Sequence, residues 1–369
     1  MELSRRLFIG ASLATLAERG RADVNAAIFP YGTHVYREPP LPFEAIEADL
    51  PLLKRLGFTM IKIQESWSAD ERREGEVDLS LVERVVAGAR TNGLLVYFGI
   101  TMEQAPAWLW RKYPDAQMVY EDGTPHNDPT QYLLPADGKP GPCWHHPGAR
   151  AAGSRFVEAL ARIIGKYDNI LIWNAFQEIG FWPLRPGHPI GFCYCKHTLS
   201  EFRLWLQKQY GTLDRLNRGW RTSFGEWEEV EPPRSFGQVP AMLDWRYFMD
   251  DVTLSDNLRW KTEALRRGDP SRRPVMAHTN SPTIGSTADW RYARVLDVFG
   301  SSAYPSWGEL EDPDTSADER VGRSNLPYEQ LWSGVMLKFD YARSASVKGE
   351  FWTLMVRPAR VWVRTWLPS

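Results

Sequence analysis

The sequence predicts an α/β protein of the (β/α)₈ barrel class whose eighth strand and helix are missing. A helical stretch that ends near a glycine and is followed by a short apolar strand recurs along the chain. The expected strands are continuously apolar, which is typical of a parallel sheet covered by helices. A doubly wound sheet usually shows a glycine-rich phosphate turn after its first strand, and FPYGTHVYREPP at residues 29–40 contains none. The chain has 369 residues, a length that is compatible with a single barrel domain.

Each unit has its own start and stop signals. PFEAIEADLPLLKRLG spaces its apolar residues for a helix and stops at Gly57 before the strand FTMIKI. DLSLVERVVAGARTNG begins with Asp78, a residue type that caps helices, and stops at Gly93 before LLVYFGI. Further helices are expected at residues 155–169, 243–267, 289–296 and 328–346. The expected strands are residues 26–32, 58–63, 94–100, 170–176, 274–280, 297–305 and 349–356.

Composition and charge narrow the choice of partners. The formal net charge is −2, and no basic stripe with interleaved aromatic residues is present, so the chain is not expected to bind nucleic acid. Its 17 Trp, 14 Tyr and 16 Phe residues exceed what a core needs. Such rings stack on the faces of sugars, although packing is their commonest use.

The N-terminus predicts a twin-arginine export signal over residues 1–25, followed by the barrel domain over residues 26–369. Arg5 and Arg6 precede a short apolar run at residues 7–17. This run is too short to span a membrane, and no other segment has the composition of a span. Charged residues follow the run at once without an A-x-A cleavage site, so the alternative to export is a cytoplasmic protein.

Polar and aromatic side chains collect where the expected strands end. The stretch LIWNAFQEIG reads as a buried strand that ends on Gln177 and Glu178. In a barrel of this class, functional residues lie at the carboxyl ends of the strands. The other residues in such places are Gln64, Glu65, Trp67, His278, Asn280, Tyr304 and Trp307. The sequence therefore predicts a polar site with aromatic walls at this edge of the sheet.

A carboxylate in such a site suits proton donation to a glycosidic oxygen. Retaining glycosidases pair this acid with a second, nucleophilic carboxylate about 5 to 5.5 Å away on another strand. An amide at Gln177 is suited to hydrogen-bond a sugar hydroxyl. Plainer interpretations also fit: Gln177 and Glu178 as the start of a solvated loop, Glu65 as the ion-pair partner of a nearby Lys or Arg, and His278 as a hydrogen-bonded rim residue.

From about Phe29 to Trp352 the sequence resembles glycoside hydrolase family 42, a family of β-galactosidases with a (β/α)₈ catalytic domain. The resemblance implies that Glu178 is the acid/base, that Gln177 replaces the asparagine that holds the 2-hydroxyl, and that Tyr304 lies near the nucleophile. It is carried by these blocks: PLLKRLGFTMIKIQESWS, APAWLWRKYPDAQMVYEDG, WNAFQEIG where the family commonly has WQIDNEYG, CYCKHTLSEFRLWLQKQYGTLDRLNRGW, the Tyr-Pro of SSAYP, and FW at 351–352. The expected substrate-binding residues are Gln177, Glu65, Trp67, Tyr304, Trp307 and Trp227.

Three departures from the family pattern bear on activity. The amide residue is glutamine, whose side chain is one methylene longer than that of the family's asparagine. The nucleophile would follow FW within a pattern like FW-x-x-E-x-Q, and Met355 stands at the matching place. Glu350 lies before the strand and is a poor substitute. The chain stops at Ser369 without an eighth strand or the C-terminal domains of longer relatives, which predicts a truncated barrel.

The three cysteines predict a partial metal site. Cys143, Cys193 and Cys195 match three of the four cysteines with which many family members bind zinc, and the fourth falls on Thr198. A tetrahedral site would then take a replacement ligand from His145, His146 or His197. The alternative is a set of reduced, buried thiols.

The resemblance implies a retaining hydrolase of terminal β-D-galactosides, acting in carbohydrate metabolism on a galactoside or oligosaccharide and needing no cofactor for catalysis. Structural zinc and homo-oligomer formation are also expected. One alternative is a carbohydrate-binding protein that keeps the rim and has lost its nucleophile. Another is a fragment that fails to fold because an open parallel edge exposes unpaired backbone groups.

Overall fold

The computed structural model describes residues 29–37, 42–125, 141–181, 192–235, 237–279, 287–302, 336–337, 339–346, 348 and 350–354. Several expectations fall outside these ranges. They are the leader at residues 1–25, the residues Asn280, Tyr304, Trp307 and Met355, and part of the helix expected at 328–346. No helix among the described residues is long and apolar enough to cross a membrane.

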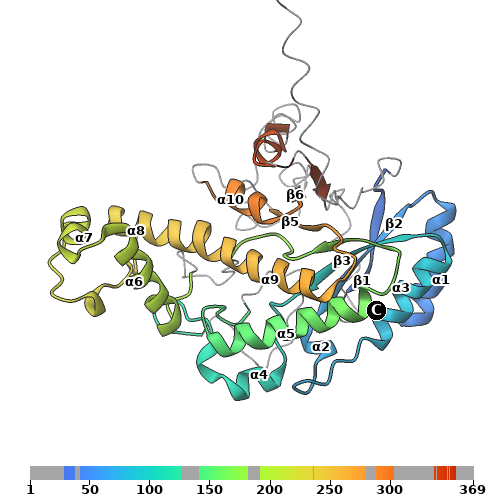
Figure 1. The fold of residues 1–369 in the computed structure, drawn as a ribbon, viewed down its shortest axis with the longest axis horizontal. Coiled ribbons are helices and arrows are strands. Elements are labelled where there is room, and N and C mark those ends of the chain that lie inside the picture. The colour runs from blue at the N-terminus through green and yellow to red at the C-terminus, as the bar shows by residue number, and fades with distance from the viewer. Residues whose placement is uncertain are drawn as a thin grey trace, which may run out of the picture.

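A curled parallel sheet forms the centre of the molecule (Figure 1). Its seven described strands lie in the order of the sequence, and each pairs in parallel with the next. This order is that of a partial barrel, which confirms the predicted fold class. The strands are β1 Gly32–Arg37, β2 Met60–Ser66, β3 Leu95–Thr101, β4 Ile170–Asn174, β5 Val275–Thr279, β6 Val298–Ser302 and β7 Phe351–Leu354.

The first strand begins later than the sequence predicted. The expected strand at residues 26–32 is wrong in its described part, because β1 starts only at Gly32. Pro30 has no backbone N–H to give to a ladder, and Phe29 is 79% exposed. The pairing with β2 begins at Gly32 and Thr33, and a register shift between His34 and Tyr36 leaves Val35 out of the ladder.

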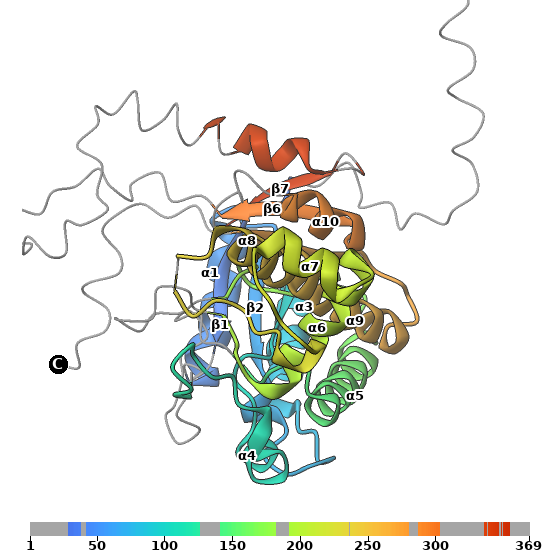
Figure 2. The same ribbon diagram turned by 90° about the vertical axis from the view of Figure 1, so that its left-hand side faces the viewer.

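Helices cover the outer face of the sheet, as the sequence predicted (Figures 1 and 2). α5 and α9 pack side by side, and α1 packs on α3. The α-helices are α1 Phe43–Arg55, α2 Trp67–Asp70, α3 Ser80–Thr91, α4 Ala107–Lys112, α5 Pro147–Ile164, α6 Lys196–Tyr210, α7 Leu213–Trp220, α8 Val239–Arg246, α9 Leu254–Gly268 and α10 Ala288–Val295. Two 3₁₀ turns, η1 Pro114–Ala116 and η3 Trp227–Glu229, and a π-helical segment, η4 Tyr247–Thr253, complete the described helical elements.

The helix expected at residues 243–267 is one continuous helical stretch with a wide turn inside it. α8, η4 and α9 follow one another without a break from Val239 to Gly268. The side chains of Phe248 and Met249 in the π-helical segment are buried in a cluster with α6 and α7. A π-helical turn shifts the register by one residue, which is a common feature near functional sites.

Three groups of buried apolar side chains divide the interior. The largest lies between the outer face of the sheet and the helices and includes Leu50, Val86 and Phe98. A second, separate group joins the cysteine segments to α6, α7 and α8. The third is small and lies on the inner face of the sheet; its buried members are Met60, Tyr97, Ile172, Met276 and Val298.

Candidate active site

The inner face of the sheet changes from apolar to polar along the strands. Side chains alternate between the two faces of a strand, so Gln64, Asn174 and His278 face the same side as the inner residues Met60, Ile172 and Met276. The apolar residues lie toward the amino ends and the polar residues toward the carboxyl ends. This arrangement places a polar surface at the edge where barrels of this class bind their ligands.

The polar inner residues are deeply buried. Neither ring nitrogen of His278 and neither side-chain polar atom of Asn174 has a hydrogen-bond partner among the described residues. Burial, and then the charge of Lys62, hold the pKa of His278 well below its usual range, so the ring is neutral at pH 7. Buried polar atoms of this kind normally bind protein, water or a ligand. The inner face is therefore suited to polar contents rather than to a dry core.

Glu178 lies just beyond the carboxyl end of β4 in a strained backbone conformation. Its φ is 53°, in the left-handed region that side-chain-bearing residues avoid at a cost of about 1–2 kcal/mol. Two other described residues without a glycine's freedom share this property, Arg221 at the C-cap of α7 and Arg272 in a turn. Glu178 has no helix end to explain it. Strain that the surroundings maintain is common at functional sites.

Backbone hydrogen bonds to the next strand hold this strained segment in place. The N–H of Ala175 donates to the Met276 carbonyl, and the N–H of Ile179 donates to the His278 carbonyl, both at 2.8 Å. Gln177 and Glu178 lie between these anchors and keep part of their surface exposed. β4 itself ends at Asn174, earlier than the strand expected at residues 170–176, so Gln177 and Glu178 lie in a bend beyond the strand that these backbone bonds hold against β5.

A buried lysine from β2 contacts the amide of Gln177. The Lys62 Nζ donates to the Gln177 Oε1 at 2.7 Å, and Lys62 is only 9% exposed. The ammonium also lies 5.5 Å from the centre of the Tyr97 ring on the intervening strand β3. The contact joins the interior of β2 to the segment after β4, and the two residues are 115 apart in the sequence.

Trp67 is not available to a sugar, contrary to its predicted role in the substrate site. It is completely buried in the cluster between sheet and helices, and its ring packs against Trp108, Trp144 and Phe156. Its Nε1 donates to the Glu71 Oε2 at 2.5 Å. Trp67 was expected at the rim because the strand was expected to end at residue 63. β2 in fact continues to Ser66.

Glu65 also faces away from the inner surface. It lies inside β2, on the same side of the strand as Ile61 and Ile63, which pack toward the helices. The side chain is 1% exposed, and its Oε1 accepts a hydrogen bond from the Ser66 N–H at 3.1 Å. Strand alternation therefore favours a structural role for Glu65 over its predicted contact with substrate.

Trp227 and Glu350 lie in other places. Trp227 forms part of η3 and packs against the cluster of α6, α7 and α8. Glu350 precedes the first residue of β7, so it lies at the amino edge of the parallel sheet, opposite Glu178. Its Oε1 accepts a hydrogen bond from the Trp352 Nε1 at 3.1 Å. This placement confirms that Glu350 is no substitute for a nucleophile at the carboxyl edge.

An ion pair with a buried lysine packs against Phe176, two residues before Glu178. Lys261 of α9 is completely buried, and its Nζ lies 3.1 Å from the Glu103 Oε1, just after β3. The same ammonium lies 4.0 Å from the centre of the Phe176 ring, one residue before Gln177. Burial lowers the pKa of Lys261, and Glu103 opposes that shift. The pair thus ties α9 and the β3 end to the strained segment.

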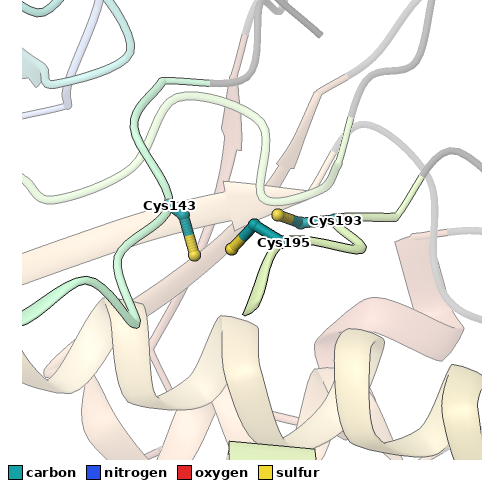
Figure 3. A group of neighbouring side chains, drawn as sticks. All are labelled: Cys143, Cys193 and Cys195. Atoms are coloured by element: carbon teal, nitrogen blue, oxygen red, sulfur yellow. The ribbon is translucent and has the colours of Figure 1, made fainter. Parts of the chain in front are cut away.

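The three cysteines come together, as the metal hypothesis requires (Figure 3). The sulfur atoms of Cys143, Cys193 and Cys195 lie within 4.8 Å of one another, and all three residues are buried. Hydrogen bonds from Cys143 and Cys193 lower the pKa of Cys195, whereas burial raises the pKa of those two thiols. One thiolate with two neutral thiol donors is the state expected of such a cluster before a metal displaces the protons.

Thr198 stands where a fourth ligand would be. Its Oγ1 lies 3.1 Å from the Cys143 Sγ and 3.5 Å from the Cys195 Sγ. Of the three candidate histidines, His145 alone contacts this position, with its Nδ1 3.1 Å from the same hydroxyl. Burial lowers the pKa of His145 to about 4, so the ring is neutral and able to act as a ligand.

His146 and His197 belong to a separate group around Asp115. Their Nε2 atoms lie 3.2 and 3.0 Å from the Asp115 carboxylate, which also pairs with Lys196 at 2.8 Å. The Nδ1 of His146 accepts the Ala149 N–H, so a neutral His146 ring carries its proton on Nε2. A protonated Nε2 and a neighbouring ammonium oppose metal binding. The group therefore serves as an ion-paired brace between α5 and α6.

Comparison with known proteins identifies the family. The family model for glycoside hydrolase family 42, described as beta-galactosidase, matches residues 36–366. The chain belongs to glycoside hydrolase family 42. The beta-galactosidase BgaA of a Planococcus species is 25% identical over 284 residues, which cover 71% of this chain and 38% of that protein. The beta-galactosidase BglY of Alicyclobacillus acidocaldarius is 26% identical over 273 residues, which cover 72% of this chain and 37% of that protein.

Solved structures share the fold of this family 42 chain. The beta-galactosidase of the psychrophilic Marinomonas ef1 superposes with a TM-score of 0.68 at 20% identity, over 88% of this chain and 48% of that one. The catalytic domain of a beta-amylase from Paenibacillus polymyxa superposes with a TM-score of 0.60 at 17% identity, over 89% and 92%. The barrel is thus shared with an enzyme of another name, and the fold alone does not fix the substrate.

Several residues of this family 42 site were missed by the sequence reasoning. Lys62, Asn174 and Tyr97 lie inside segments whose composition is typical of buried strands, and composition does not show which face of the sheet they occupy. A lysine within the apolar run FTMIKI was the available signal, because a charged residue in a buried strand needs a partner. Lys261 lies within the long helix expected at residues 243–267, where the sequence alone does not distinguish a buried lysine from an exposed one.

Proposed function

We propose that this chain carries the sugar-binding site of a retaining β-galactosidase and that Glu178 is its proton donor. The observation that carries the proposal is the strained placement of Glu178 at the carboxyl end of β4, beside an amide that Lys62 holds. That the sugar is a galactoside is inferred from relatives that are named beta-galactosidases. The chain spans less than two fifths of the length of these two relatives, so the activity of a whole enzyme is part of the proposal.

The chemistry assigned to Glu178 is general acid–base catalysis. Its carboxyl proton passes to the glycosidic oxygen as the bond from that oxygen to C1 of the sugar breaks. In a retaining enzyme, a nucleophilic carboxylate then forms an ester with C1. Glu178, now a carboxylate, removes a proton from the water that hydrolyses the ester. Gln177 is placed next to this acid to hydrogen-bond a sugar hydroxyl.

The second carboxylate is the part of this chemistry that the sequence does not supply. Met355 stands at the matching place, and a thioether does not form the glycosyl ester. This observation favours a second candidate function, a galactoside-binding protein with impaired hydrolysis. The two candidates share the same binding site and differ only in turnover.

Binding and turnover are separated by two measurements on the purified chain. Galactose is expected to raise the midpoint of thermal unfolding in a saturable manner, because a ligand that binds only the folded state stabilises it. Glucose, which differs at the 4-hydroxyl, serves as the control and is expected to have a smaller effect. Hydrolysis of nitrophenyl β-galactoside reports turnover. The proposed site is refuted if neither sugar changes the midpoint and no hydrolysis occurs.

We also propose that Cys143, Cys193 and Cys195 hold a structural zinc ion. Three neighbouring sulfurs are ligands that zinc prefers, and the neutral His145, which contacts the Thr198 hydroxyl beside them, is the nearest candidate for a fourth. Such an ion would join the segment before α5 to the segment before α6. It would stabilise the fold rather than take part in catalysis.

Replacing Thr198 with cysteine is expected to slow the loss of zinc to a chelator by about tenfold or more, because a fourth thiolate completes the ligand set. Zinc content is measured by elemental analysis during dialysis against the chelator. Thr91→Cys, on the exposed side of α3, is the control for an added thiol. Protein purified in the presence of zinc that holds none, in the unmodified chain and in Thr198→Cys alike, would rule out the site.

A further inference from the structure

Lys62 carries a charge in a place where the proposed reaction has no direct use for one. It extends from the inner face of β2 across β3, where Tyr97 is its partner in register, to an amide that follows β4. An ammonium that is nine-tenths buried is costly unless it is hydrogen-bonded. The bond to the Gln177 Oε1 is therefore one that the fold maintains, and it constrains both partners.

The contact fixes which end of the amide faces the ligand. An ammonium group has donors only, so the atom that faces Lys62 must be the amide oxygen. The Nε2 group, with its two N–H donors, then lies at the other end of the planar amide, pointing away from Lys62. No partner for Nε2 lies among the described residues. Without Lys62, the amide would be free to present either its oxygen or its nitrogen.

We propose that Lys62 is a positioning residue that orients the Gln177 amide so that it donates, and does not accept, a hydrogen bond at the sugar. This inference rests on the proposed function. It adds a rule of specificity: the sugar substituent that faces Gln177 must be an acceptor. A hydroxyl meets the rule, whereas a protonated amino group, which only donates, does not.

The rule is tested with galactose and galactosamine at pH 6, whose affinities are measured by titration calorimetry. By the proposed placement, the 2-substituent faces Gln177, and galactosamine carries a protonated amino group there. The unmodified chain is expected to bind galactose at least about tenfold more tightly than galactosamine. Lys62→Met is expected to weaken galactose binding and to bring the two affinities together. Lys62→Arg, which keeps a donor-only cation, is expected to preserve the preference.

Repeating the Lys62 substitution in a variant without the Gln177 amide separates orientation of the amide from simple charge repulsion. In Gln177→Ala, the change Lys62→Met is expected to leave the ratio of the two affinities unchanged, because no amide remains to be oriented. An equal change of the ratio with and without Gln177 would overturn the inference and assign the preference to charge. Circular dichroism and the unfolding midpoint confirm that each variant is folded.

The outcomes also distinguish this inference from the proposed function. If the unmodified chain binds neither sugar, the proposed function is wrong and the inference is wrong with it. If it binds galactose but Lys62→Met keeps the preference of the unmodified chain, only the inference is wrong.

Discussion

Met355→Glu is expected to raise the hydrolysis of nitrophenyl β-galactoside by roughly 10³-fold or more, because it restores the atom that forms the glycosyl ester. The last residue of β7, Leu354, lies at the same edge of the sheet as Glu178, and residue 355 is the next in the sequence. Glutamate is also what the family pattern places there. The measurement is kcat/KM of the purified variant against that of the unmodified chain.

Two controls make this result specific. Met355→Gln has nearly the same size and polarity without a nucleophilic carboxylate, and it is expected to stay at the level of the unmodified chain. Adding Glu178→Gln to Met355→Glu is expected to abolish most of the gain, most strongly for substrates with poor leaving groups, which need protonation. A folded Met355→Glu variant that is no more active than Met355→Gln would show that something other than the nucleophile limits turnover.

Lys261→Ala is expected to lower the free energy of unfolding by about 2–4 kcal/mol, because it leaves a cavity between aromatic rings and removes the partner of Glu103. Denaturant titration measures the change. Lys261→Met, which keeps most of the volume, is the matched control, and a smaller loss is expected because Glu103 is partly exposed to water. Equal stability of Lys261→Ala and the unmodified chain would contradict this account of the pair.

The pH dependence of this comparison has a defined sign. Burial lowers the pKa of Lys261 in the folded protein below its value in the unfolded chain. The cost of burying the ammonium is therefore fully present at neutral pH and is relieved as the pH rises through the folded pKa. The unmodified chain is expected to gain stability relative to Lys261→Met in that alkaline range. A constant difference across the range would show that burial does not perturb this group.

The fold was predictable because local and long-range signals agree. Helical stretches that stop at Gly57 and Gly93 lead into apolar strands, and the repetition of this unit along the chain implies a parallel sheet. The start of β1 was not predictable from apolarity, since the residues that pair with β2, Thr33, His34 and Tyr36 among them, do not form an apolar run. The π-helical turn in the long helix likewise depends on packing with α6 and α7, which no local pattern encodes.

The site was predictable only in part. The position of Glu178 followed from the end of an apolar run, and the meeting of the cysteines from the resemblance to the family. Trp67 and Glu65 were misplaced because a strand that continues for three more residues brings both into the layer between sheet and helices. The contact between Lys62 and Gln177 joins residues on different strands, so it depends on the register of the sheet.

The most direct test of the central claim, that Glu178 is the proton donor of a galactoside site, is a crystal structure of the chain with galactose bound. The account predicts the anomeric oxygen of the sugar within about 2.6–3.2 Å of the Glu178 carboxylate, with the Gln177 Nε2 on the 2-hydroxyl. Galactose bound at saturating concentration with its anomeric oxygen beyond the reach of Glu178, even through one water, would contradict it.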